Sequence, residues 1–303
     1  MIASEQANTG PEVLVDDRRF MLRGTDFAPD CMTLAYNFRG SARRPYVSTL
    51  VGPSGRNMLE CRPPDHAHHL GLWWGHGDVN GVDFYLELER EDMDHGRVEH
   101  VAFDEIVDDD PWFGFDETLE WRDPDGVALI AERRILLAHY ADDHWYTVDL
   151  DSTCTACVDL KFGDTKESVM PGLRVAEVLT TNGGGSMVSS EGGVGEQECF
   201  GKPAGWIDRC GRRGGVWHKE YVEGVAVFDH PSNPHPATWF ARDYGPLSPF
   251  PGHHFLGGGA LAAGESLQLR YRLLVHEGDS VEADVAGQYE RYVEESVATG
   301  EHD

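Results

Sequence analysis

The chain has 303 residues, of which 40% are hydrophobic and 26% are charged. This composition is that of a globular protein and excludes a wholly disordered or fibrous chain. The 53 acidic residues outnumber the 25 basic ones, so the formal net charge is −28. Because so negative a surface repels phosphate backbones and anionic lipids, we expect neither nucleic acid nor a membrane as a partner.

The first ten residues are polar and contain no apolar segment of the kind that a secretion signal needs. We expect a flexible N-terminus over residues 1–10 and a single domain over residues 11–298. The six cysteines show no disulfide framework, which favours a cytoplasmic protein with reduced thiols. Cys154 and Cys157 lie in an alternating, strand-like stretch, where their side chains point to opposite faces. We therefore expect no zinc at this pair.

Turn signals recur at short intervals between runs rich in Val, Leu, Tyr, Phe and Trp, which is typical of strands. The clearest hairpin joins residues 117–121 to residues 127–138 through the D-P-D-G turn at 123–126. A strand-like run follows over residues 144–162. Further strands are expected over residues 45–51, 81–89, 97–106, 173–179, 224–228 and 265–275. No helical stretches alternate with them, so the pattern predicts an all-β fold, a single large β-sandwich.

One helix is expected, at the C-terminal end, capped by Asp279 or Ser280. The residues at helical spacing on its apolar face are Val281, Val285, Tyr289 and Tyr292. The uncharged run over residues 244–264 is long enough to span a membrane. Its three prolines and six glycines would break a helix, so we predict a loop there.

Residues 62–84 carry the strongest functional signal, because four histidines, two tryptophans and three acidic residues fall within 23 positions. If residues 65–69 are extended, His66 and His68 share a face and His69 points away. Imidazoles titrate near neutral pH and suit acid–base catalysis. An H-x-H pair can instead bind a divalent metal ion, with His66 and His68 as candidate ligands. A third interpretation is that some of these rings are buried and hydrogen-bonded to carboxylates.

The two adjacent tryptophans face opposite ways in an extended segment, so we expect one of them in the core. The other can form a flat platform on which a sugar ring stacks, and we choose Trp74 for that role.

The same segment resembles the D-H-x-H-H-x-G-L-W-x-x-H-G-D-V-N-G-V-D-F signature of a family labelled PmoA or DUF6807. The similarity continues in order through residues 163–167, 172–176, 201–206, 228–234 and 239–245. It covers roughly residues 40–295. One departure is Lys202-Pro203, where the family more often has a Lys-Arg pair.

This resemblance implies a fold similar to the galactose-mutarotase-like β-supersandwich proteins. It also implies a sugar ligand, because the gene neighbourhoods of the family tend to involve carbohydrate breakdown and sugar oxidoreductases. The methane-oxygenase name attached to the family would require apolar membrane spans, and the sequence predicts none.

The matched motifs supply further candidates. Arginine is the usual cation in this chain, with 21 Arg against four Lys, so Lys166 and Lys202 stand out as retained lysines. A salt bridge between Lys166 and Glu167 is the alternative interpretation. His230 lies in a loop stiffened by three prolines. The expected catalytic residues are His69, His76, Lys166 and His230. The expected substrate-binding residues are Trp74, Asn80, Asp83, Glu167, Arg174, Lys202, Arg242, Asp243 and Tyr244.

The leading hypothesis is an enzyme that performs elimination, hydrolysis or epimerisation on a small-molecule carbohydrate. A histidine or Lys166 would remove a proton from a sugar carbon, and another histidine would protonate the leaving oxygen. An arginine or a metal ion would stabilise the oxyanion. No cofactor is predicted apart from this optional divalent metal. The alternatives are a non-catalytic carbohydrate-binding protein and a metal-dependent oxygenase using His66, His68 and Asp83.

The enzyme hypothesis makes a geometric prediction. One concave site should be lined by His66, His68 or His69 together with His76, Lys166, Lys202, His230 and Arg242.

Overall fold

The computed structural model describes residues 11–25, 28–88, 90–140, 144–216, 219–250 and 252–300. The N-terminal segment over residues 1–10, which we expected to be flexible, lies outside this range.

In the described part of the chain, two antiparallel sheets of eight strands each make up most of the fold. The first sheet has the order β1-β2-β3-β4-β5-β13-β18-β17. Its strands are β1 (Glu12–Val15), β2 (Arg19–Thr25), β3 (Ala28–Asn37), β4 (Tyr46–Leu50), β5 (Leu72–His76), β13 (Ser168–Arg174), β18 (Pro246–Ser248) and β17 (Phe240–Ala241).

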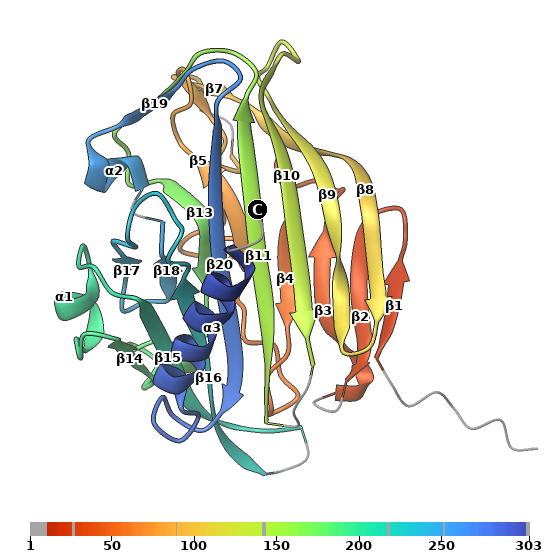
Figure 1. The fold of residues 1–303 in the computed structure, drawn as a ribbon, viewed down its shortest axis with the longest axis vertical. Helices are drawn as coiled ribbons and strands as arrows, with labels where there is room; N and C mark the ends of the chain where they lie inside the picture. Colours follow the sequence, from red (N-terminus) through yellow and green to blue (C-terminus); the bar gives the residue numbers. More distant parts are fainter. Residues whose placement is uncertain are drawn as a thin grey trace, which may run out of the picture.

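The second sheet has the order β14-β15-β16-β20-β11-β10-β9-β8 and lies in front of the first in Figure 1. Its strands are β14 (Ser186–Ser189), β15 (Trp206–Gly214), β16 (Glu220–Asp229), β20 (Ser266–Glu277), β11 (Trp145–Ala156), β10 (Ala128–His139), β9 (Trp112–Arg122) and β8 (Arg97–Asp109).

Shorter elements complete the chain. Strand β12 (Leu160–Phe162) pairs with β19 (Gly259–Leu261), and β6 (Val82–Asp83) pairs with β7 (Asp94–His95). The helices are η1 (Glu177–Leu179), α1 (Gly195–Cys199), α2 (Gly252–Leu256) and α3 (Val285–Gly300). No helix in the described part of the chain is long and apolar enough to cross a membrane.

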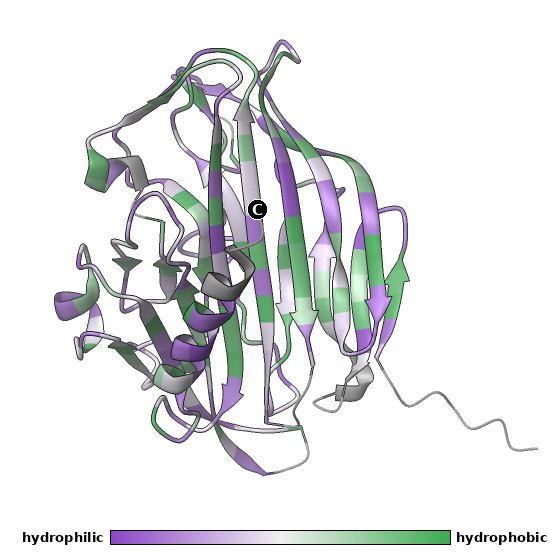
Figure 2. Cartoon of the chain, viewed as in Figure 1, coloured by the Kyte–Doolittle hydropathy of each residue, from purple (hydrophilic) through white to green (hydrophobic). Residues whose placement is uncertain are grey.

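The core lies between the two sheets because their strands alternate between buried and less buried residues. In β11 the buried Val148 and Leu150 alternate with Asp149 and Asp151, and Figure 2 shows this alternation as bands of colour along the long strands. Apolar residues of both sheets join in one core cluster. The all-β sandwich that the sequence predicted is therefore confirmed.

The core also contains a polar network. The guanidinium of Arg134 on β10 is buried, donates two hydrogen bonds to the carboxylate of Glu132 and lies 3.9 Å from the ring centroid of Trp74. Its Nη1 also donates to the hydroxyl of Tyr36 on β3, at 3.0 Å. This hydroxyl in turn donates to Glu117 on β9. The network thus connects the two sheets through their interior.

The C-terminal helix packs on the outer face of the second sheet, where Val285 and Tyr292 contact residues of β15, β16 and β20. Its start differs from our expectation. The helix begins at Val285, and the side chain of Val281 is 84% exposed rather than packed. The carboxylate of Asp279 accepts the N–H groups of residues 281 and 282, which holds a separate turn before the helix.

Two predicted strands are also wrong in extent. The strand predicted over residues 81–89 is limited, within the described residues 81–88, to Val82–Asp83, because the carboxylate of Asp83 accepts the next backbone N–H groups and turns the chain. Of residues 173–179, the strand ends at Arg174 and η1 follows.

The second sheet ends at β8, which pairs on one side with β9. Val101 and Ile106 of this strand are exposed, and so are the acidic residues Asp104, Glu105, Asp108 and Asp109.

Candidate functional site

Three histidines gather on the outer face of the first sheet, in the loop that leads into β5. The loop is closed by a hydrogen bond from the Arg62 N–H to the carbonyl of His69, at 2.7 Å. Arg62 adopts a positive φ of 54°, and the His69 N–H donates to the carbonyl of His66. The segment is therefore a series of turns and not the extended run we expected. As a result all three imidazoles lie together.

The imidazoles form a stack with aromatic neighbours. The ring of His66 is parallel to that of His69 at 4.7 Å between centroids and to that of Tyr244 at 5.0 Å. His68 meets His69 edge-on at 4.6 Å and lies 5.3 Å from Tyr85. We call these five residues the histidine face. His66 and His68 are partly exposed, so the face is open to solvent through them.

Beneath the histidine face lie polar groups that are buried without partners. The ring of His69 stacks on Trp73, which β5 directs away from the core. Within the described part of the chain, His69 Nδ1, Trp73 Nε1 and Arg174 Nη1 have no hydrogen-bond partner. Buried polar atoms without partners are costly, so a cluster of them marks a place where polar ligand atoms or ordered water fit.

Tyr244 is positioned by a tight turn between β17 and β18. The Gly245 N–H donates to the carbonyl of Arg242, and Gly245 has a φ of 122°. A Cβ at Gly245 would lie 3.2 Å from Arg174 Nε, so glycine permits the close approach of this arginine. The Arg174 guanidinium lies 5.0 Å from the ring centroid of Tyr244 and 3.6 Å from the carboxylate of Asp65.

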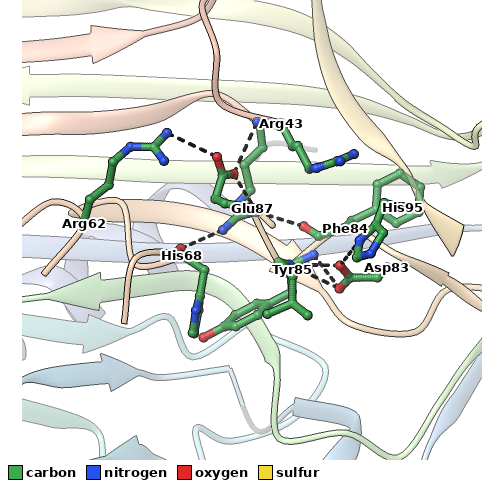
Figure 3. Close-up of polar contacts among 10 residues, drawn as sticks. Arg43, Arg62, His68, Asp83, Phe84, Tyr85, Glu87 and His95 are labelled. Carbon is green, nitrogen blue, oxygen red and sulfur yellow. Dashed lines mark hydrogen bonds and ion pairs between the residues drawn. The ribbon is translucent and has the colours of Figure 1, made fainter. Parts of the chain in front are cut away.

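Tyr85, the other tyrosine of the histidine face, is fixed by a network of charged residues, shown in Figure 3. The carboxylate of Asp83 accepts the N–H of Tyr85 and contacts His95. The buried Glu87 pairs with Arg44, whose Nη2 donates to the carbonyl of His68. In Figure 3 the side chains of His68 and Tyr85 lie side by side on the side away from Glu87.

The protonation of the histidine face follows from its contacts. Asp65 Oδ2 lies 2.8 Å from His66 Nδ1, and because a carboxylate only accepts, Nδ1 is the donor. The neutral His66 ring therefore carries its lone pair on Nε2. Burial, followed by the nearby His66 and Arg44, lowers the pKa of His68.

We expect the buried His69 to make the protein less stable in mild acid. Burial, followed by His68, His66 and Arg174, lowers the pKa of His69 to about 2, whereas an unfolded histidine titrates near about 6.5. The stability that the neutral His69 contributes is complete above the pKa of histidine in the unfolded chain. It is lost as the pH falls from that value toward the pKa of His69 in the folded protein. Between pH 7 and pH 5 this amounts to about 2 kcal/mol.

Urea denaturation at the two pH values measures this loss. The wild type should lose about 2 kcal/mol more than His69→Gln, which lacks the titrating group. Equal losses in the two proteins would contradict a neutral, buried His69.

The structure brings some of the predicted site residues together and separates others. His66, His68, His69, Arg174 and Tyr244 converge. Arg242 and Asp243 lie beside them, bound to Glu196 of α1. Lys166 is exposed in the loop before β13. Its neighbour Glu167 lies close enough for its charge to act on the pKa of His68.

Trp74 and His76 lie elsewhere, because alternate residues of β5 face opposite sides of the sheet. Trp74 is 1% exposed and packs in the core under Arg134, so it is not the platform that we expected. His76 faces the same interior, is fully buried and lies 5.3 Å from Phe162. Its Nδ1 accepts the N–H of Asp78.

The side chains of Asn80 and Asp83 form hydrogen bonds with backbone groups of the chain, which is a structural role and not the substrate-binding role that we expected. Asn80 has a positive φ of 55° and bonds the backbone of residues 159 and 161 across a turn. Asp83 supports Tyr85, as described above.

His230 and Lys202 also lie away from the histidine face. His230 follows β16 and contacts Tyr292 of α3, on the outer face of the second sheet. Lys202 is exposed and lines a different cavity, together with Glu191 and Glu198. The prediction that all these residues line one concave site is therefore wrong for His76, Lys202 and His230.

The proposed ligand set of His66, His68 and Asp83 does not assemble, because the Asp83 carboxylate is occupied by backbone N–H groups and His95. Over the described residues, no group of three or more His, Cys, Asp or Glu side chains is arranged to hold a metal ion. Cys154 is buried and Cys157 is exposed, and both are free thiols.

Sequence reasoning did not select several residues that shape the histidine face. Asp65 and Trp73 lie within the motif, but the sequence alone does not distinguish their roles from those of their neighbours. Tyr85 directly follows the motif, so its position was a usable signal. Arg44 and Glu87 gave no signal, because only the fold brings them beside His68.

Comparison with known proteins yields one family. The model of a family of unknown function, DUF6807, matches residues 29–290 of the chain, a range that includes the whole histidine face. No curated protein matches the chain. Among solved structures, a galactose mutarotase related enzyme from Lactobacillus acidophilus is similar with 8% sequence identity. The similarity covers 88% of this chain and 97% of that one, with a TM-score of 0.34.

Proposed function

This chain belongs to the DUF6807 family, and we propose that its histidine face is the active site of an enzyme that performs acid–base chemistry on a sugar. The observation that carries the proposal is the Asp65–His66 pair. The carboxylate holds one imidazole nitrogen as a donor and leaves the other as a base, at a partly exposed position.

The neighbouring groups provide the remaining roles. His66 Nε2 removes a proton from a sugar carbon next to a carbonyl, and Asp65 stabilises the imidazolium that forms. Arg174, whose Nη1 has no hydrogen-bond partner among the described residues, stabilises the oxyanion that develops on the carbonyl. The ring centroid of His68 lies 5.6 Å from that of His66, and His68 relays the proton that His66 has removed to the leaving oxygen in elimination and hydrolysis. Elimination, hydrolysis of an oxidised glycoside and epimerisation all begin with the removal of the proton next to the carbonyl by His66.

A sugar is the substrate class that the surroundings favour. Tyr244 and the buried Tyr85 flank the histidines, and the partly exposed ring of Tyr244 suits the C–H face of a pyranose, which packs well on an aromatic ring. Their hydroxyl groups remain protonated at neutral pH, since burial raises the pKa of both tyrosines. They can therefore donate hydrogen bonds to sugar oxygens.

Deuterium exchange tests the proposal without knowledge of the final product. Glucose, galactose and their 3-keto derivatives are incubated with the protein in D₂O, and NMR follows deuterium incorporation next to the carbonyl. The wild type should catalyse exchange into at least one of them, and His66→Ala should slow it at least about 10²-fold. The matched control is His139→Ala on β10, a partly exposed histidine stacked on Trp112, which should leave the rate unchanged.

Binding is measured in parallel by titration calorimetry. A sugar that binds the wild type without exchange would overturn the enzyme and leave a carbohydrate-binding protein. If none of the sugars binds and none undergoes exchange, the carbohydrate function itself is overturned.

A further inference from the structure

We propose that a second pocket, on the outer face of the second sheet beside α3, binds a neutral sugar or a similar polyhydroxylated ligand. The cavity has a volume of about 450 Å³, within the usual range for small-molecule sites. Strands β10, β11 and β20 form its floor, and α3 and the loop after β16 form its walls. Figure 1 shows α3 lying in front of β20, on the face away from the first sheet. The histidine face belongs to the first sheet, so this pocket is a separate site.

Two ion pairs lie side by side on the floor of the pocket. Arg270 Nε is 2.9 Å from the carboxylate of Asp151, and Arg272 binds that of Asp149 on the same pair of strands. Each pair offers an acceptor and a donor next to each other at a fixed distance. Neighbouring hydroxyl groups of a sugar present the same combination of donor and acceptor.

His230 adds a neutral donor at the wall of the pocket. Its Nδ1 accepts the backbone N–H of Ser232 at 3.1 Å, so the ring proton is on Nε2. Burial lowers the pKa of this imidazole, which keeps the ring neutral at pH 7. With its basic nitrogen already engaged, His230 is suited to donating a hydrogen bond to a hydroxyl. This accounts for a histidine that stands apart from the histidine face.

The charges and the apolar floor select the class of ligand. Three carboxylates, of Asp149, Asp151 and Glu295, face two guanidinium groups, so a further anion is not attracted. The net charge of −28 on the protein acts in the same direction. Ile135 and Leu137 supply an apolar surface beside these groups, which fits the C–H face of a pyranose.

Methyl NMR tests the proposal at the pocket itself. Protein with labelled Ile and Leu methyl groups is titrated with the methyl glycosides of glucose, galactose and mannose, and with glucuronate. At least one neutral glycoside should shift the Ile135 and Leu137 signals in a saturable way, with an affinity at least tenfold higher than that of glucuronate. Leu137→Arg places a long side chain in the cavity and should weaken this binding at least tenfold.

Thr155→Arg is the matched control. It lies four residues beyond Asp151 on β11, outside the cavity lining, and should leave the binding unchanged. Melting temperatures verify that both variants are folded. No saturable shift at Ile135 and Leu137 with any neutral glycoside, equal affinity for glucuronate, or unaltered binding in Leu137→Arg would each overturn the proposal. The Ile135 and Leu137 signals report on this pocket alone. A failure of this proposal is therefore distinguishable from a failure of the function proposed for the histidine face.

Discussion

Asp65→Asn should reduce the rate of proton transfer about 10³-fold at pH 7 with little change in KM. An asparagine can present its NH₂ group to His66 Nδ1, which then becomes an acceptor and moves the ring proton to Nε2. The lone pair that we assign as the base is lost, although the shape of the site is retained. Deuterium exchange and steady-state kinetics of the responsive sugar measure the effect.

The chain offers a matched control for this substitution. Asp164 and His254 form a second exposed pair with the same 2.8 Å contact to Nδ1, and neither residue belongs to the histidine face. Asp164→Asn should leave the rate unchanged, whereas Asp65→Glu should restore part of it because the acceptor returns. An Asp65→Asn enzyme with normal kcat but a lowered melting temperature would show that Asp65 has only a structural role.

Arg134→Met should lower the free energy of unfolding by about 3–5 kcal/mol. The substitution leaves the carboxylate of Glu132 buried between the sheets without its cation, and it removes the guanidinium that lies over Trp74. Urea denaturation at pH 7 measures the loss. The double variant Glu132→Gln/Arg134→Met should be more stable than the single one, since neither buried charge remains.

Arg133 on the same strand provides the comparison. Its side chain is 62% exposed and pairs with Asp116 on the outside of the sheet, so Arg133→Met should cost less than about 1 kcal/mol. Similar losses in the two arginine variants would contradict a stabilising role for the interior network.

The sequence predicts those parts of the fold that depend on local patterns. Alternation and turn signals identify the hairpin of β9 and β10, and helical spacing identifies the C-terminal helix. The sequence does not predict strands β1, β2 and β3, because their pattern is less regular than that of the central strands. Helical spacing predicts too early a start for α3, since Val281 fits the spacing but lies in the turn before the helix.

For the candidate site, the sequence predicts several of the residues but not how they are arranged. A dense motif identifies the histidines and Tyr244, but their arrangement depends on turns that bend residues 62–70. Because side chains alternate between the two faces of a strand, Trp74 and His76 share one face of β5. Only the packed sandwich shows that this face is the interior. His230 is separated from the motif because β16 joins the second sheet, and a single sequence does not reveal which sheet a strand joins.

The acidic surface of β8 has a consequence for how copies of this protein meet. A strand at the end of a sheet is a template for another strand, and one with exposed apolar residues such as Val101 and Ile106 is prone to aggregation. A second β8 aligned here would bring its own carboxylates within about 5 Å of Asp104 and Asp108. Their mutual repulsion keeps this edge from self-assembly at neutral pH and low ionic strength. Acid or high salt, which neutralises or screens these charges, removes that protection.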